Sequence, residues 1–160
     1  MTETVTIRPL VPGDITDVVR IDAIHTGAEQ RPYWRRLFRE FLAPERGREH
    51  VALAAEAGGE LAGFLFADVR AFEFGSEPCG WILEVGVDPA LARQGVASGL
   101  LAEAVRRLRA VGVPTVRTMV RRNNVPMLTF FRTNGFAGGP YVQLELMDDQ
   151  ENADAGSGSD

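Results

Sequence analysis

Residues 88–101, DPALARQGVASGLL, combine a polar loop with the start of an apolar helical pattern. Gly95, Ala97 and Ser98 have side chains too small to cover the backbone N–H groups of a first helical turn, and Arg93 adds a positive charge beside them. Such N–H groups have no intrahelical acceptor and carry a partial positive charge. The stretch therefore predicts a site for an anion such as phosphate or pyrophosphate. A glycine-started helix packed tightly on a sheet is the alternative.

Glu84 is the second candidate for a chemical role, because it is an acidic residue in the middle of the apolar stretch WILEVGV. A buried carboxylate is costly for folding unless it is paired or protonated, so such placements are often functional. Glu84 is our candidate for a general base, acting directly or through a water molecule. The alternative is a buried ion pair with a cation such as Arg117 on the following predicted strand.

Hydropathy periodicity and turn residues predict the elements that position these groups. Gly58 and Gly59 predict a tight hairpin. The element order β-α-α-β-β-β-α-β-α-β mixes this hairpin with strand–helix–strand units, so we predict a three-layer α/β sandwich on a mixed, mostly antiparallel sheet. The strands are predicted at 5–10, 51–56, 61–68, 81–88, 115–120 and 141–147, and the helices after residues 14, 32 and 95 and at 126–134.

The 160-residue chain has a globular composition, with 45% hydrophobic and 24% charged residues. Its net charge of −5 comes from five acidic residues at 148–160, since the 17 other acidic residues balance 17 basic ones. We expect one domain at 1–147, followed by a disordered acidic tail at 148–160. The neutral body gives no electrostatic footprint for nucleic acid, and no apolar run approaches the ~20 residues of a membrane span.

The cysteine and histidine content favours a reducing compartment and argues against a metal site. The only cysteine, Cys79, allows no internal disulfide, and the N-terminus lacks the features of a secretory signal, so we expect a cytoplasmic protein. His25 and His50 have no partner at metal-ligand spacing, so we expect no metal.

The sequence resembles the GNAT superfamily of acetyl-CoA-dependent N-acetyltransferases over residues 5–147, because it contains two stretches in the order and at the separation of two motifs of that family. GVDPALARQGVASGLL is similar to the family's pyrophosphate-binding motif. NVPMLTFFRTNGF is similar to a second motif, in which an Asn leads an aromatic helix that ends in Gly-Phe. The resemblance implies a GNAT-like acyl-CoA N-acyltransferase fold, acetyl-CoA as the acetyl donor, and a primary amine of a small molecule or peptide as the acceptor.

The resemblance also implies which residues bind the donor. The backbone of Val85 and Val87 would pair with the pantetheine arm, and Gly86 would let that arm approach closely. Asn124 would hydrogen-bond the arm, and Phe130 or Phe131 would pack against it, although Phe131 could equally be core. The N–H groups that would hold the pyrophosphate belong to Arg93, Gln94, Gly95, Val96, Ala97 and Ser98.

Two positions depart from the family pattern. Ala92 stands where the motif usually has Arg or Gln, which leaves Arg93 and Gln94 to compensate. Phe131 stands where many members carry a Tyr that protonates the departing thiolate, and such acid catalysis is worth roughly 10²–10⁴ in rate. A thiol with a pKa of about 8.5 still leaves tolerably as the thiolate. Tyr141, the only tyrosine further along the chain, is the alternative acid.

These observations predict an acyltransferase in which the amine attacks the thioester directly. A covalent enzyme intermediate is not expected, because Cys79 has no histidine partner. The alternative, suggested by Phe131, is a non-catalytic acetyl-CoA-binding module that senses the ligand or acts through a partner. The resemblance also implies a possible homodimer, because related folds often pair, and pairing would cover the exposed edge of the mixed sheet.

Overall fold

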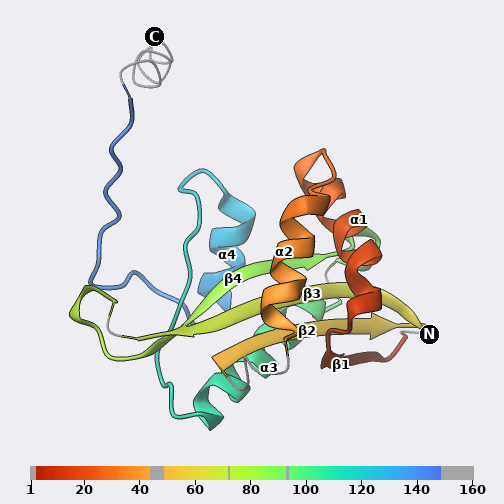
Figure 1. Ribbon diagram of the computed structural model, residues 1–160, viewed down its shortest axis with the longest axis horizontal. Coiled ribbons are helices and arrows are strands. Elements are labelled where there is room, and N and C mark those ends of the chain that lie inside the picture. Colours follow the sequence, from red (N-terminus) through yellow and green to blue (C-terminus); the bar gives the residue numbers. More distant parts are fainter. Residues whose placement is uncertain (1–2, 44–48, 72, 93, 149–160) are drawn as a thin grey trace.

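The computed structural model describes residues 3–43, 49–71, 73–92 and 94–148. Within these residues one sheet has the strand order β1-β2-β3-β4-β5 (Figure 1). Strands β1 to β4 pair antiparallel, and β4 pairs parallel with β5, so the predicted mixed, mostly antiparallel sheet is confirmed. The strands are β1 (Val5–Pro9), β2 (His50–Ala57), β3 (Glu60–Arg70), β4 (Cys79–Val87) and β5 (Val116–Arg117).

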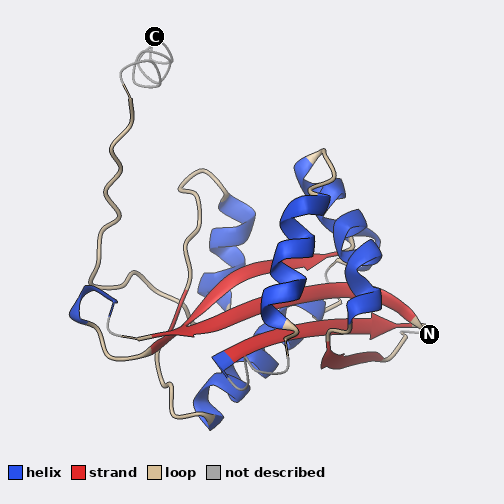
Figure 2. Ribbon diagram, viewed as in Figure 1, coloured by secondary structure: helices blue, strands red, loops and turns tan. Residues whose placement is uncertain are grey.

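Helices cover both faces of the sheet. Figures 1 and 2 show α1 and α2 on one face and α3 on the other, and α4 shares a core with α3. The predicted three-layer sandwich is therefore confirmed. Within the described residues, no helix is both long and apolar enough to cross a membrane. The helices are α1 (Ile15–Thr26), α2 (Arg31–Phe41), α3 (Val96–Ala110) and α4 (Val125–Thr133).

The two faces bury cores of different character. The α3/α4 face is largely aliphatic: Leu100 and Leu108 of α3 pack on Leu53 and Leu65 of the sheet. The α1/α2 face is aromatic, and aromatic residues of α2 supply much of it. Aromatic pairs of this kind favour edge-to-face geometry, which holds α2 in one orientation over β3. The buried aromatic residues of this face are Trp34, Phe38, Phe41, Phe64 and Phe66.

A bulge in β4 decides where Glu84 points. Phe66 pairs with Glu84 and Ala67 with Ile82, so Leu83 is an extra residue in β4. A bulge of this kind re-aims the side chains beside it. Ile82 belongs to the α3/α4 core, and Leu83 packs against the α1/α2 core. Glu84 also points to the α1/α2 face, where it meets Tyr33 of α2.

Two predicted strands are corrected by the structure. The strand predicted at 115–120 is reduced to β5, because β4 and β5 diverge after two paired residues. The strand predicted at 141–147 is absent: these residues are exposed and have no strand partner among the described residues. Extended backbone becomes a strand only when a neighbour accepts its hydrogen bonds. Of the predicted tail, only Asp148 lies within the described residues.

Candidate functional site

The start of α3 presents bare backbone donors. Gly95 precedes the helix with a φ of 76°, a left-handed conformation that favours glycine. Its carbonyl accepts the first helical bond, from Gly99 N at 2.9 Å, so the N–H groups of Val96, Ala97 and Ser98 lie ahead of the helical ladder. Within the described part of the chain no side chain caps them. The structure thus provides the arrangement that the sequence predicts for an anion.

The other residues predicted to bind the anion have different surroundings in the structure. Gln94 is exposed beside the helix start. Val96 contributes only its backbone, because its side chain is buried in the core. Ser98 Oγ accepts a hydrogen bond from Asn134 Nδ2 at 3.3 Å, which joins the start of α3 to the end of α4. Arg93 lies outside the described residues.

Strand β4 has an open edge in its second half. Its pairing with β5 is confined to Gly80 and Trp81. Asp88 N donates to Ala62 O at 2.8 Å, on the β3 side. Because backbone groups alternate along an antiparallel strand, those of Val85 and Val87 point away from β3, toward the side that β5 leaves open. A ligand that pairs like an added strand fits this edge.

Two findings change the roles expected around this edge. The carbonyl of Val87 accepts a hydrogen bond from His25 Nε2 at 2.7 Å, so α1 already uses one of the acceptors. Gly86 is explained by packing: a Cβ at this position would lie 2.6 Å from Cζ of Phe64. The α1/α2 core therefore requires the glycine, independently of any ligand.

Glu84 accepts a hydrogen bond from Tyr33 Oη and has no cationic partner among the described residues. Burial raises the pKa of Glu84 above its usual range; the Tyr33 hydrogen bond opposes that rise, and the negative charge of Asp22 adds to it. Asp22 on α1 accepts from Trp34 Nε1 at 2.9 Å. Strand β4 and helices α1 and α2 thus bring the carboxylates of Glu84 and Asp22 near each other in a partly buried setting. Such a setting suits a group that accepts a proton from a cation.

The ion pair considered for Glu84 does not form. Arg117 donates instead to Ser76 Oγ at 3.0 Å and contacts Cys79 Sγ at 3.4 Å. Its guanidinium also lies 4.8 Å from the ring centre of Tyr141. Arg117 pairs in register with Trp81, before the bulge, whereas Glu84 follows the bulge and points to α2.

Tyr141, the predicted alternative acid, is about half exposed and contacts Arg117 and Phe74 near the start of β4. Among the described residues, its contacts bring it neither to Glu84 nor to the start of α3. Cys79 is buried as the first residue of β4.

The second motif forms the short helix α4. Asn124 is its N-cap, and its side chain accepts from Met127 N at 3.2 Å, which leaves the amide N–H₂ as the group that it can offer to a ligand. Phe131 is buried in the α3/α4 core, and its ring packs at 5.0 Å against both Phe130 and Phe136. The structure gives Phe131 a packing role, and Phe130 is partly buried beside it.

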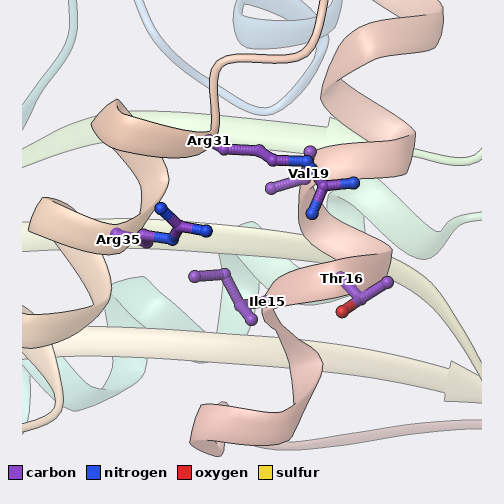
Figure 3. Close-up of a pocket in the computed structure, with 5 residues that line it drawn as sticks. All are labelled: Ile15, Thr16, Val19, Arg31 and Arg35. Carbon is purple, nitrogen blue, oxygen red and sulfur yellow. The ribbon is translucent and has the colours of Figure 1, made fainter.

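The pocket in Figure 3 lies between α1 and α2 and is lined by Ile15, Thr16, Val19, Arg31 and Arg35. None of these residues belongs to the predicted site. Its two guanidinium groups would repel a cationic amine, so it does not suit the predicted acceptor. Among the described residues there is also no cluster of three potential metal ligands.

Sequence reasoning missed the partners of Glu84 and Val87. Nothing in the sequence sets Tyr33 apart from the other aromatic residues of α2, and His25 was considered only as a metal ligand. Asp22 and Trp34 carry no signal of their own either. The four residues lie on α1 and α2, and only tertiary packing brings them against β4.

Comparison with known proteins identifies the family. The model of the acetyltransferase (GNAT) family matches residues 17–136. The chain belongs to this family. The match includes most of α1 and the whole of α3 and α4, so the predicted membership of the GNAT superfamily is confirmed.

The chain is similar in sequence or in structure to several individual acetyltransferases. A mycothiol acetyltransferase of Pseudarthrobacter chlorophenolicus is 29% identical over 141 residues, covering 84% of this chain and 43% of the relative. One of Saccharomonospora viridis is 33% identical over 87 residues, covering 52% and 28%. The chain thus spans less than half the length of these relatives. An aminoglycoside N-acetyltransferase solved with CoA superposes with a TM-score of 0.78 at 18% identity, covering 92% of this chain and 97% of that one, which confirms the predicted fold.

Proposed function

We propose that this protein transfers the acetyl group of acetyl-CoA to a primary amine by direct attack. The observation that carries this proposal is the position of Glu84, a carboxylate with a raised pKa and no cationic partner among the described residues, on the strand with the open edge. Membership of the GNAT family and the CoA complex of a structural neighbour support the choice of donor.

The donor site in this proposal is made mainly of backbone groups. The N–H groups at the start of α3, from Gln94 to Ser98, hold the pyrophosphate, with Arg93 beside them. Val85 and Val87 pair with the pantetheine arm along the open edge of β4, and Gly86 lies between them. Asn124 offers its amide N–H₂ to the same arm, and Phe130 packs against it. Phe131 supports Phe130 from within the core.

Glu84 is the general base of the proposal. An ammonium has no lone pair, so the acceptor must lose a proton before it attacks the thioester. Glu84 takes that proton, and the amine nitrogen then bonds to the acetyl carbon. The carbon–sulfur bond breaks with its electron pair remaining on sulfur, and the nitrogen gives up its second proton to water, which leaves the neutral amide. The nearby charge of Asp22 favours a cationic acceptor on this side of β4.

Protonation of the thiolate by water fits this site better than protonation by a side chain. Phe131 has no proton to give and is buried in the core. Tyr141 contacts Arg117 and Phe74 instead of the groups around Glu84. A thiolate with an ordinary pKa of about 8.5 is an adequate leaving group near neutral pH.

Turnover distinguishes this proposal from the alternative, a module that binds acetyl-CoA without catalysis. The purified chain is titrated with acetyl-CoA by calorimetry and then assayed for thiol release with small amines, polyamines, amino acids and peptides. Binding together with release above the hydrolysis background supports the enzyme. Binding without any release supports the module, and no binding at high micromolar acetyl-CoA contradicts both.

The proposal also covers the domain organisation, the compartment and the oligomeric state of the enzyme. Residues 1–147 act as one acetyltransferase domain in the cytoplasm, without a metal, and the acceptor is a small molecule or a peptide. Two copies of the chain pair as a homodimer, because the outer edge of β5 has no partner strand among the described residues.

A further inference from the structure

The end of β4 is tied to α1 by two hydrogen bonds from side chains of the helix. Val87 is the last residue of the strand, and its carbonyl accepts from His25 Nε2 at 2.7 Å. Asp88 follows it, and its carboxylate accepts from Arg20 Nη1 at 2.9 Å. Figure 1 shows α1 beside this end of β4. The helix therefore holds the two residues at which the strand passes into the segment before α3.

The carboxylate of Asp88 connects two parts of the chain. Its Oδ2 accepts from Arg20, and its Oδ1 accepts from Ala90 N at 3.0 Å and so caps the short 3₁₀ helix Pro89–Leu91. The side chain is 18% exposed, and the hydrogen bonds from Arg20 and Ala90 lower the pKa of Asp88, so it is charged at neutral pH. One oxygen thus holds α1, and the other holds the backbone of the following turn.

The turn that Asp88 caps leads to the proposed donor site. Leu91 is followed a few residues later by Gly95 and the uncapped start of α3. Backbone donors act on a bound anion only when they are held near one geometry, and a displacement of about 1 Å can cost roughly 10²-fold in function. Within the described residues, Arg20–Asp88 is also the only ion pair that joins α1 to the segment between β4 and α3.

A contribution to stability does not by itself account for this ion pair. Arg20 is 45% exposed, and pairs with such an exposed partner add little to the free energy of unfolding. Asp88 can cap the turn without Arg20, so the pair adds the connection to α1 and not the cap. The helix is a firm anchor for that connection, because Val18 and Ile21 are fully buried in the α1/α2 core.

We propose that Arg20 is a positioning residue for the donor: through Asp88 it fixes the turn Pro89–Leu91 and, with it, the N–H groups at the start of α3. The affinity for acetyl-CoA then depends on a side chain that lies on the opposite face of the sheet from α3. His25 supports the same geometry by orienting the carbonyl of Val87, which keeps a second lone pair for the pantetheine arm. This inference rests on the proposed donor site and adds a residue that neither sequence motif contains.

Calorimetry with acetyl-CoA on the full chain tests the positioning role. Arg20→Gln is expected to weaken acetyl-CoA binding by about five- to tenfold, whereas Arg20→Lys keeps the charge and should restore most of the affinity. Arg31→Gln is the matched control, because it removes a similarly exposed arginine from an ion pair, with Glu29, before α2. The control should bind acetyl-CoA like the wild type, and Arg20→Gln and Arg31→Gln should have similar melting temperatures.

A double-mutant cycle tests whether Arg20 acts through Asp88. Asp88→Asn can still accept from Ala90 N but loses the charge that holds Arg20, so it should weaken binding to a similar extent. Adding Arg20→Gln to Asp88→Asn should then change the affinity no further. In turnover, the effect should appear in the KM for acetyl-CoA and leave kcat unchanged, because Glu84 is not part of this connection.

The outcomes separate this inference from the donor site on which it rests. A wild type that does not bind acetyl-CoA would overturn both. If the wild type binds, unchanged affinity in Arg20→Gln would overturn the inference alone. An equal loss in Arg31→Gln, a further loss when Arg20→Gln is added to Asp88→Asn, or an effect confined to kcat would also overturn it.

Discussion

On the α3/α4 face of the sheet the groups available for binding belong to the backbone, whereas on the α1/α2 face they belong to side chains. The start of α3 offers N–H groups and no capping side chain among the described residues. The other face offers Glu84, Tyr33 and Asp22. Tyr33 donates a hydrogen bond to Glu84, and the charge of Asp22 acts on the same carboxylate. Strand β4 lies between the two faces: its second half has an open edge, and its bulge turns Glu84 toward α2.

This difference has a physical cause. A site built from backbone needs small residues at fixed spacing, so it leaves a local pattern such as QGVAS in the sequence. A site built from side chains on separate elements leaves no such pattern, because its spacing is set by packing. The backbone site should therefore tolerate changes of distant side chains, and the side-chain site should respond to single-atom changes.

Glu84→Gln should give the largest effect. The amide keeps the shape and can still accept from Tyr33, but it cannot take a proton, so kcat should fall by roughly 10²-fold or more and the acidic limb of the pH–rate profile should flatten. Acetyl-CoA affinity should stay unchanged. Turnover across pH and calorimetry on the same preparation measure both.

The melting temperature of Glu84→Gln provides the control. Burial raises the pKa of Glu84 in the folded state, so the folded protein binds this proton more tightly than the unfolded chain does. Its carboxylate therefore costs stability as pH rises through the folded pKa. At neutral pH the Gln variant should melt at the same or a higher temperature. A large loss of stability would instead indicate an ion-pair partner for Glu84.

Phe131→Tyr tests whether position 131, where many family members carry the catalytic Tyr, has only a packing role in this protein. A hydroxyl added to this buried ring has no evident partner and should cost about 1–3 kcal/mol of unfolding free energy. Turnover of the folded fraction should not rise. Urea unfolding and the rate at high pH measure the two effects, and a faster rate would show that position 131 reaches the thiolate after all.

Ala97→Asp should affect stability and binding with opposite signs. A carboxylate in the first turn of α3 favours the helix by about 0.3–1 kcal/mol, but it repels a pyrophosphate at the same N–H groups. Acetyl-CoA should bind roughly tenfold more weakly, a loss of about 1.4 kcal/mol. Ala110→Asp, at the exposed C-terminal end of the same helix, is the matched control and should lower stability without changing affinity. Equal weakening by both variants would argue against this anion site.

Tyr33→Phe should give the smallest effect. The Tyr33 hydrogen bond holds the pKa of Glu84 below the value that burial alone would give. Removing it should move the acidic limb of the pH–rate profile to higher pH by up to about one unit, with the plateau rate changed only a few-fold. Tyr141→Phe should leave the limb in place. A shift with Tyr141→Phe and none with Tyr33→Phe would reverse the assigned contacts.

Much of the fold was predictable from local signals. Gly58 and Gly59 have positive φ values of 59° and 82°, as a tight hairpin turn requires, and the strands beside them form as predicted. The helix predicted after residue 32 also forms, as α2, and its aromatic residues enter the core of the α1/α2 face. The pattern at 141–147 also predicted a strand, but local alternation specifies only extended backbone; a sheet needs a neighbour, which the described part of one chain does not provide.

The sequence by itself determined the order of the elements from β1 to α4, the bare start of α3 and the presence of one acidic residue in an apolar strand. Tertiary structure alone decided the environment of that residue. One extra residue, Leu83, turns Glu84 toward α2, where it meets Tyr33 instead of Arg117. Helix starts and hairpins are short-range features that a few adjacent residues encode. The protonation of this partly buried carboxylate depends on groups 51 residues apart in the chain, which only the packed fold brings within hydrogen-bonding distance.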